Sequence, residues 1–344
     1  MARAIPIRNI YYLLLYAWNR LPEGKAIDVS GVSSPDLPNL LAKVLTEGVR
    51  QLQRRGLDRQ YVQSDEDLTR PRGRMLLADT LRRGLLGRVQ VACTTDDLSY
   101  DVLHNRIIKS TLEKLAKTDE IDRTLRDAII AITNSLDAVQ SVGVTFRDFS
   151  RIQLHGNNAF YWFLLRICAL VHQGLLPEPG TGRFRFRDVL SDPQAMGLIF
   201  QDFVRNFFAL EQKEFQSKGE TFRWPIDEDY GRGQALLPTM NTDVSLLRKD
   251  ETAAIIIECK WTGDTLQRGR LRSDHLYQLN AYMRYHSRAL KSPAAVEGLL
   301  LYPLVDEPVD VAVGINGQRL RVRTIDLTTD WPSIRRQLLD LLPH

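Results

Sequence analysis

The stretch from Asp243 to Lys260 contains two carboxylates and one ammonium in a spacing that could hydrolyse a phosphodiester. Glu258 and Lys260 have one residue between them and follow the apolar run 253–257, so on a strand their side chains would share one face. Residues 244–247 and 253–257 are expected to pair as a β-hairpin around the polar turn 248–251. That pairing would bring Asp243 opposite the Glu258 and Lys260 side chains.

Two carboxylates this close repel each other unless a cation lies between them. Mg²⁺ is suited to such a place, because it prefers oxygen ligands and takes one or two protein carboxylates together with water and substrate phosphates. We therefore predict a Mg²⁺ site made by Asp243, Glu258 and the main-chain carbonyl of Cys259. Lys260 would face the attacking water or the phosphate and stabilise the negative transition state. The alternative is a salt-bridged strand end, since an Asp followed by Glu-x-Lys also arises by chance.

A second polar motif follows at helical spacing and begins at Ser273, a residue type that can cap a helix. Gln278 and Tyr282 are four residues apart and would share one face of that helix, with His275 on about the same side. We expect Gln278 and Tyr282 to position the lysine or the DNA. The loop between the two motifs contains Arg268, Arg270 and Arg272, which either contact DNA phosphates or belong to a solvated loop.

These motifs together resemble the PD-(D/E)xK nuclease superfamily in its RecB-like form. The whole chain resembles the McrC family, the nuclease subunit of the McrBC modification-dependent restriction system. Beyond the candidate site, the resemblance is carried by residues 5–12, 72–74, 105–112, 298–303 and 331–332, so it spans nearly all of the 344 residues.

The resemblance implies an α/β protein in which an N-terminal α+β partner-binding domain precedes a restriction-endonuclease-like domain with a mixed central sheet flanked by helices. It also implies that the N-terminal half docks on a hexameric McrB-like AAA+ GTPase and stimulates GTP hydrolysis. Assembled with that partner, the C-terminal half would cleave double-stranded DNA that contains 5-methylcytosine. Nucleases of this superfamily often add a helix glutamate to the metal site. The candidate position here is Gln201, with Asp202 expected to point toward solvent, so one Mg²⁺ is expected and Gln201 would bind metal-bound water.

Length and composition place limits on the organisation of the chain. A length of 344 residues exceeds what one core usually organises, and the Pro- and Gly-rich residues 177–182 predict a boundary between domains 1–178 and 183–344. The net charge of +4 is only a weak bias toward nucleic acid. Three widely separated cysteines predict neither zinc nor a disulfide framework, which favours a reducing compartment.

Residues 10–18 are apolar and require comparison with a signal peptide. They are rich in Tyr and Trp, no small-x-small cleavage site follows, and the run is too short to span a bilayer. We therefore expect a buried helix in a cytoplasmic protein with no membrane partner.

Two functions from other classes also fit the sequence. A non-catalytic regulator would activate the GTPase and hold DNA, and the intact Glu258-x-Lys260 motif argues against it. A free-standing repair or recombination nuclease would need no motor, and the long N-terminal half argues against that reading.

Overall fold

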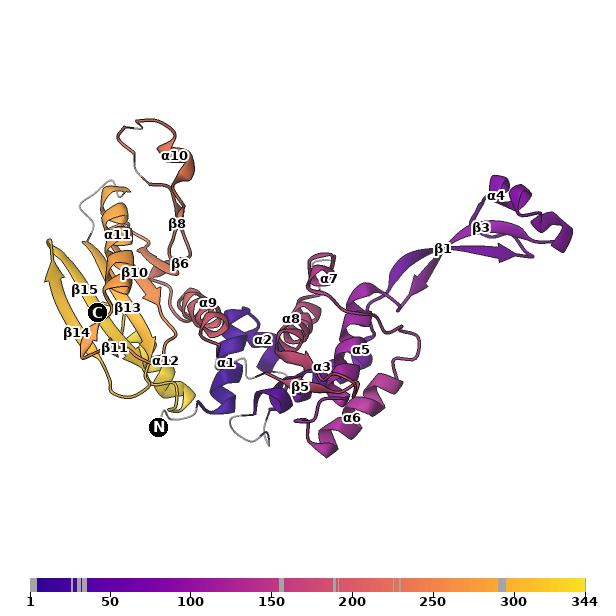
Figure 1. Ribbon diagram of the computed structural model, residues 1–344, viewed down its shortest axis with the longest axis horizontal. Helices are drawn as coiled ribbons and strands as arrows, with labels where there is room; N and C mark the ends of the chain where they lie inside the picture. Colours follow the sequence, from indigo (N-terminus) through magenta and orange to yellow (C-terminus); the bar gives the residue numbers. More distant parts are fainter. Residues whose placement is uncertain are drawn as a thin grey trace. The chain divides into compact units, whose positions relative to one another are not determined.

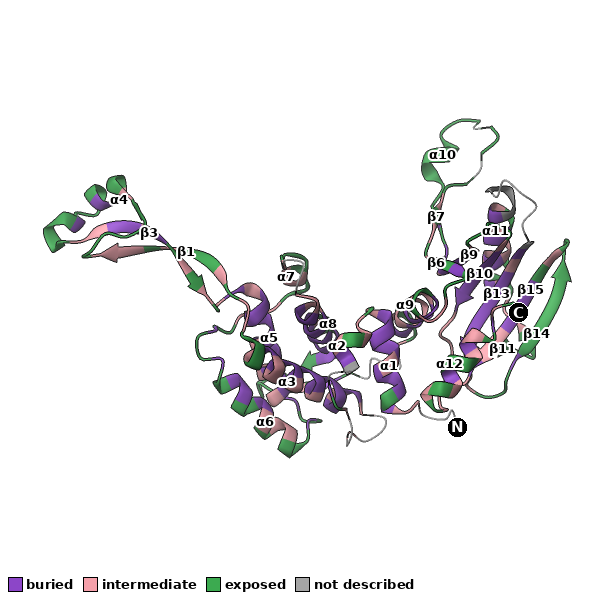
Figure 2. Cartoon of the chain, turned by 180° about the vertical axis from the view of Figure 1, so that it is seen from behind, coloured by how far each residue is buried: buried purple, intermediate pink, exposed green. Residues whose placement is uncertain are grey.

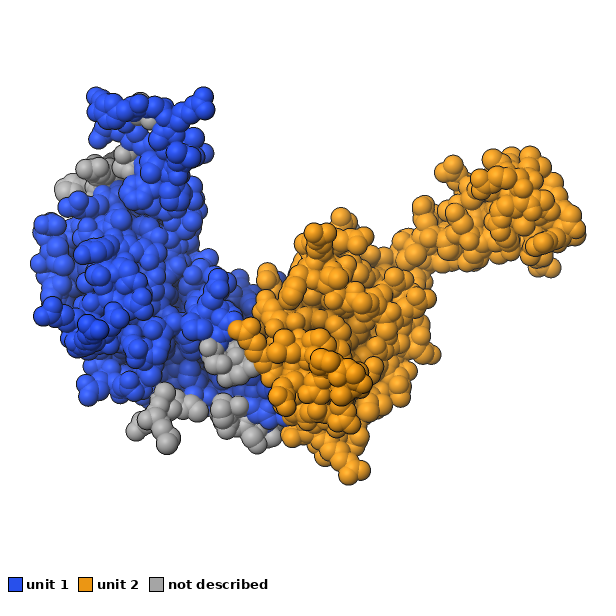
Figure 3. Space-filling view, viewed as in Figure 1, with its two compact units in different colours: residues 1–40, 188–344 blue, residues 41–187 orange. Residues whose placement is uncertain are grey.

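The computed structural model describes residues 5–25, 27–29, 32, 36–154, 158–187, 190, 192–224, 226–228, 230–289 and 295–343. The chain forms two compact units, shown in separate colours in Figure 3. Unit 1 combines residues 1–40 with residues 188–344, and unit 2 consists of residues 41–187.

A six-stranded mixed sheet organises unit 1. Its strand order is β14 (Asp310–Ile315), β15 (Gln318–Ile325), β13 (Ala295–Pro303), β10 (Ala253–Cys259), β9 (Val244–Arg248) and β6 (Phe215–Lys218). Strand β13 runs parallel to both β10 and β15, whereas the other neighbours are antiparallel. The predicted mixed central sheet is confirmed.

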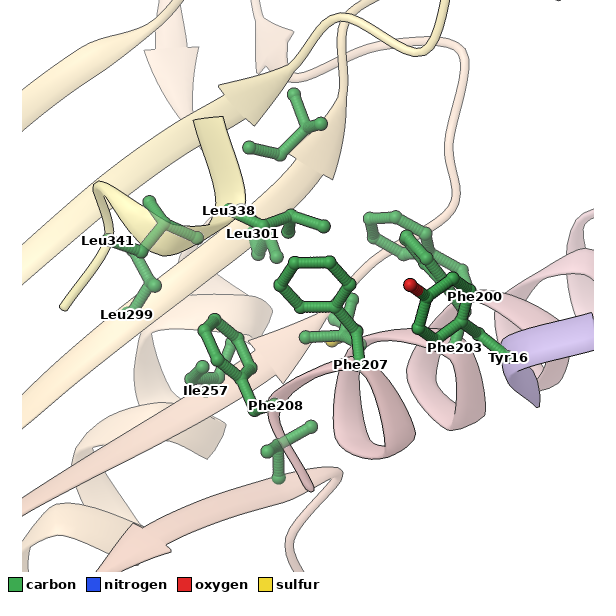
Figure 4. Close-up of a cluster of buried hydrophobic side chains, with 14 of the residues drawn as sticks. Tyr16, Phe200, Phe203, Phe207, Phe208, Ile257, Leu299, Leu301, Leu338 and Leu341 are labelled. Carbon is green, nitrogen blue, oxygen red and sulfur yellow. The ribbon is translucent and has the colours of Figure 1, made fainter. Parts of the chain in front are cut away.

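Helices cover both faces of this sheet because its central strands are apolar on both sides. Helices α1 (Ile7–Ala17), α9 (Pro193–Glu211) and α12 (Trp331–Leu339) pack on one face, where four phenylalanines of α9 meet leucines and isoleucines of the strands (Figure 4). Helix α11 (Ser273–Ala289) packs on the other face through Leu279, Tyr282 and Met283. The alternation assigns Ile255 and Ile257 to the α9 face and Ala254 and Ile256 to the α11 face.

Local sequence signals determine several of these elements. Asp192 caps α9 by accepting hydrogen bonds from two main-chain N–H groups, and Pro193 occupies the first turn. The polar turn after Arg248 joins β9 to β10, with Glu251 at a positive φ of 60°. The Asn316-Gly317 turn joins β14 to β15, and both residues have positive φ, as the tight hairpin turn requires.

The first helix belongs to unit 1, which corrects the predicted domain of residues 1–178. Helix α1 packs along α9, and the Asn9 side-chain amide donates hydrogen bonds to the carbonyls of Leu327 and Thr329 at 2.8 and 2.7 Å. The Tyr16 ring stacks on Trp331 with centroids 5.2 Å apart. The Asn9 and Tyr16 contacts join residues more than 300 positions apart, which no local pattern in the sequence could indicate.

The Pro- and Gly-rich stretch 177–182 is a hairpin turn within unit 2 and not a linker. It connects β4 (Leu175–Pro177) to β5 (Phe184–Phe186), which pair antiparallel. The boundary between the units therefore falls after Arg187, close to the predicted position.

Unit 2 combines a helical body with a protruding arm. The body contains α5 (Leu103–Ala116), α6 (Arg123–Asn134), α7 (Phe146–Ser150), α8 (Ala159–Gly174) and most of α3 (Leu37–Arg55). The arm consists of β1 (Gln60–Leu68), β2 (Arg74–Met75), α4 (Leu77–Arg82), the 3₁₀ turn η1 (Leu85–Arg88) and β3 (Val91–Ser99), and much of it is exposed (Figure 2).

Short elements complete unit 1: α2 (Leu21–Lys25), β7 (Thr221–Phe222), α10 (Gly233–Leu236), β8 (Met240–Asn241), β11 (Leu266–Gln267) and β12 (Arg270–Leu271). Strands β7 and β8 pair, and α10 lies in the loop beyond them (Figure 1). Across the described part of the chain, no helix has the length and hydrophobicity needed to cross a membrane.

Candidate active site

The structure brings Asp243 and Glu258 together at the end of β10. Ile257 pairs with Val244 in the antiparallel ladder, so the next residues on each side, Glu258 and Asp243, lie opposite each other. Asp243 Oδ2 accepts a hydrogen bond of 2.8 Å from the main-chain N–H of Cys259. This contact fixes the Asp243 carboxylate beside the strand that contains Glu258.

Glu258 is a buried carboxylate whose hydrogen bonds are incomplete. Its exposed fraction is 1%, and Oε1 accepts a hydrogen bond of 2.6 Å from Lys260 Nζ. Oε2 is also buried and has no hydrogen-bond partner among the described residues. A buried acceptor without a partner is costly, so this oxygen is an obvious position for a ligand such as a cation.

Burial raises the pKa of both carboxyls, and the charge of Asp243 adds to the shift at Glu258. Burial, followed by the charge of Asp243, raises the pKa of Glu258 to about 7, although Lys260 opposes the shift. Burial also raises the pKa of Asp243 above its ordinary value, against the lowering effect of the Cys259 N–H and the nearby cations. A divalent cation between the two groups would remove the electrostatic reason for these shifts.

A chain of hydrogen bonds connects Lys260 to α11. Besides its contact with Glu258, Lys260 Nζ donates to Gln278 Oε1 at 2.9 Å. Gln278 Nε2 in turn donates to Tyr282 Oη at 3.0 Å, and burial raises the pKa of the Tyr282 phenol. The helical spacing of Gln278 and Tyr282 therefore lets the two side chains continue the hydrogen-bond chain that starts at Lys260.

His275 lies on the same helix but has a different partner. Its Nδ1 lies 2.8 Å from Tyr302 Oη, and the imidazole is buried. Burial, together with the charge of Lys260, lowers the pKa of His275 to about 4, so the ring is neutral at physiological pH. His275 thus packs α11 against β13, and we assign it no part in the chemistry.

The contribution of α9 differs from the expectation for Gln201. The structure shows no hydrogen bond from Gln201 to the described part of the site. Instead Arg205 Nε donates to the main-chain carbonyl of Asp243 at 3.1 Å, and Arg205 forms an ion pair with Asp202. Asp202 also lies near enough to raise the pKa of Asp243 by its charge. Helix α9 therefore approaches the site through Asp202 and Arg205, and not through Gln201.

A further group of residues supports the loop that leads to Asp243. The Thr242 N–H donates to the carbonyl of Glu220 at 2.9 Å, and the Glu220 N–H donates to Thr242 Oγ1 at 3.0 Å. The Glu220 carboxylate lies 2.9 Å from His286 Nε2. Burial acts to raise the pKa of Glu220, but the neighbouring His286, Lys218 and Ser245 outweigh it and lower the pKa to about 2. Glu220, Arg205 and His286 were not predicted from the sequence. Only the position of His286, four residues after Tyr282, gave a signal.

The residues at the site fit a single hard cation. Asp243 and Glu258 supply two carboxylates, and the buried Glu258 Oε2 has no hydrogen-bond partner among the described residues. The main chain of Cys259 lies next to the Asp243 carboxylate. The Cys259 thiol belongs to the core on the α9 face, so it is no ligand here. Among the described residues, no group of three or more His, Cys, Asp or Glu side chains is arranged to hold a metal ion.

Comparison with known proteins identifies the family. The family profile of the McrBC 5-methylcytosine restriction system component matches residues 8–303. The chain is 31% identical over 341 residues to the type IV methyl-directed restriction enzyme EcoKMcrBC of Escherichia coli (strain K12), covering 98% of this chain and 97% of that protein. The chain belongs to the McrBC family.

A solved structure supports the fold of this McrBC family member. It is a half-complex from a tetradecameric assembly of Thermococcus gammatolerans McrB AAA+ hexamers with bound McrC. The matched chain has a TM-score of 0.57 and 14% identity, over 97% of this chain and 77% of that one. The family match includes the residues from Asp243 to Tyr282 and all of unit 2, so it covers both the candidate site and the arm.

Proposed function

We propose that this McrBC component is a Mg²⁺-dependent endonuclease subunit that cleaves DNA phosphodiesters with a PD-(D/E)xK site. The observation that carries the proposal is the convergence of Asp243, Glu258 and Lys260 at one strand end, with the buried Glu258 Oε2 without a partner. Such a set combines an anionic pair for a metal with a cation for the phosphate.

Asp243 and Glu258 would hold Mg²⁺, with the Cys259 carbonyl as a third protein ligand. When bound, the ion would polarise the phosphate and lower the pKa of a water molecule. The Cys259 N–H holds the Asp243 carboxylate in place, and Arg205 holds the main chain beneath it, so the site is pre-organised.

Lys260 would orient the attacking water or stabilise the charged phosphate. An ammonium has three N–H groups, and Glu258 and Gln278 accept two of them. The third N–H can donate to water or to a phosphate oxygen. Gln278 and Tyr282 would act as positioning residues. Gln278 accepts a hydrogen bond from the ammonium, and Tyr282 accepts one from Gln278.

Unit 2 would supply the partner surface. The solved relative contains McrB AAA+ hexamers with bound McrC, and we extend this partner and the stimulation of its GTPase to the present chain. Support comes from the tip of the arm, where several large apolar side chains are exposed: Met75 (52%), Leu77 (63%), Leu81 (67%), Leu86 (58%) and Val89 (77%). An apolar group of this size at a protruding tip is typical of a protein interface. The substrate would be DNA that contains 5-methylcytosine, in keeping with the family.

The test is DNA cleavage by the chain mixed with its McrB-like partner, GTP and Mg²⁺. We expect Lys260→Ala to reduce the rate by about 100-fold or more, the usual loss when one transition-state contact is removed. Lys249→Ala is the matched control, since Lys249 is an exposed lysine on the β9–β10 turn. Normal cleavage by folded Lys260→Ala would favour a non-catalytic activator, and cleavage without the partner would favour a free-standing nuclease.

A further inference from the structure

A pocket of about 720 Å³ lies against α11, and neither Asp243 nor Glu258 is among the residues that line it. Its walls come from α11, from Trp224 and Met240 near strands β7 and β8, and from Ile315 and Leu320 of the β14–β15 hairpin. Gln278 and Tyr282 face the candidate active site, whereas the residues directly before them, Tyr277 and Ala281, line the pocket. The two sites therefore share one helix.

The side chains in this pocket suit a nucleobase. Tyr277 and Trp224 are large aromatic residues with exposed fractions of 74% and 41%, so they offer flat surfaces for stacking. Asn280 provides an amide that can both donate and accept hydrogen bonds, and Arg284 provides a cation. The lining residues in the described chain include no Asp or Glu, so the charge of the pocket complements a phosphate.

Internal contacts hold the walls of the pocket in place. Phe222 stacks on the Tyr285 ring with centroids 4.3 Å apart, which ties the β7–β8 hairpin to α11. Trp224 Nε1 donates a hydrogen bond of 2.8 Å to the carbonyl of Pro238. The site is therefore formed before any ligand binds. Its volume lies within the roughly 300–1,000 Å³ range of small-ligand sites, which admits one nucleotide but no double helix.

We propose that this pocket binds an unstacked nucleobase of the DNA strand that leads to the cleaved phosphate. The inference rests on the proposed nuclease function. Met240 lines the pocket three residues before Asp243, so a strand that inserts a base here passes next to the carboxylate pair. Because extruding a base from a duplex costs a few kcal/mol, single-stranded or mismatched DNA should bind more tightly than a fully paired duplex.

The experiment measures the affinity of the full chain for a fluorescein-labelled single-stranded oligodeoxynucleotide, by anisotropy in EDTA so that cleavage cannot occur. We expect Tyr277→Ala to weaken binding about tenfold, and Tyr277→Phe to bind like the wild type because it retains the ring. Tyr61→Ala is the control, since Tyr61 in the arm has the same exposed fraction of 74%. On irradiation, a 5-iodouracil base in the oligonucleotide should cross-link to Tyr277 or Trp224.

Several results would overturn the inference. These are unchanged affinity in Tyr277→Ala, an equal loss in Tyr61→Ala, no oligonucleotide binding by the wild-type chain, or a loss of affinity for the McrB-like partner in place of DNA. Cleavage by Lys260→Ala tests the proposed function separately. If that variant cleaves DNA while Tyr277→Ala still loses affinity, the nuclease assignment fails and the pocket assignment survives.

Discussion

The molecule has two candidate functional regions, each built on a pair of antiparallel strands, and the two pairs differ in solvent exposure. Strands β9 and β10 lie in the middle of a covered sheet, and their end places Glu258, a charged group, in the protein interior. Strands β1 and β3 form an arm whose tip places Leu86 and Val89, two apolar groups, in solvent. Each arrangement is unfavourable for an isolated chain, and the proposed cation and partner surface would each relieve one of them.

Backbone conformation adds to this contrast. Val89 has a φ of 57°, which a β-branched residue rarely adopts, and it stands at the exposed tip between η1 and β3. The main chain around Asp243 is instead held by hydrogen bonds from Arg205 and to Glu220. Unit 1 therefore holds the candidate site with hydrogen bonds, whereas the arm exposes apolar side chains and an unusual backbone conformation at its tip.

The largest expected effect is on catalysis by Asp243→Asn. This variant retains an oxygen that can accept from the Cys259 N–H but loses the charge that would hold Mg²⁺. We expect cleavage in the assembled complex to fall by at least about 100-fold while the melting temperature does not decrease. Cleavage at the wild-type rate would show that Asp243 has only a structural part.

The next effect tests the arm. Placing a charge in an apolar interface should weaken binding to the McrB-like partner by about 30-fold or more, as expected for a central interface residue. The variant is Leu86→Asp, and the control is Leu198→Asp on α9, because the exposed fractions are 58% and 57%. Affinity is measured by calorimetry. Equal losses of affinity in the two variants would show that the arm is not part of the interface.

A third prediction concerns the pH dependence of stability. The folded protein holds the Glu258 proton up to a pKa of about 7, compared with about 4.5 for the usual carboxyl. This group therefore stabilises the folded state most below pH 4.5, and its contribution is lost as the pH rises to about 7. In EDTA at pH 8, Glu258→Gln should melt a few degrees above the wild type, because the buried charge is gone.

Thermal melts at pH 5 and pH 8, with EDTA or with Mg²⁺, check this prediction. Mg²⁺ should raise the melting temperature of the wild type at pH 8 and leave Glu258→Gln nearly unchanged, since a ligand of the folded state stabilises it. A wild-type melting temperature that does not respond to Mg²⁺ would contradict the assignment of the metal site.

The smallest effect is expected for Tyr282→Phe. The Lys260–Gln278 hydrogen bond remains in this variant, and only the bond from Gln278 to the Tyr282 hydroxyl is lost. One such bond contributes about 0.5–1.5 kcal/mol, so kcat should fall by roughly two- to tenfold, with little change in KM. A loss as large as that of Lys260→Ala would place Tyr282 in direct contact with the substrate.

Much of unit 1 could be predicted because its signals are local. The apolar run before Glu258, the Asn316-Gly317 turn and the Asp192-Pro193 cap each depend only on neighbouring residues, so a local pattern is sufficient to indicate them. The same alternation that buries Ile256 also places Glu258 and Lys260 on the α11 face, near Gln278. Residue types and spacing were sufficient for that part of the site.

The tertiary structure alone decided which distant segments belong together. The packing of α1 on α9, the approach of Arg205 to Asp243 and the Glu220–His286 pair all join residues that are remote in sequence. Side-chain periodicity determines which face of an element is apolar, but it does not specify the opposing element. The sequence by itself therefore indicated which two carboxylates and which lysine meet at the end of β10. The fold determined which residues support that chemistry, because long-range packing depends on the shapes of several elements at once.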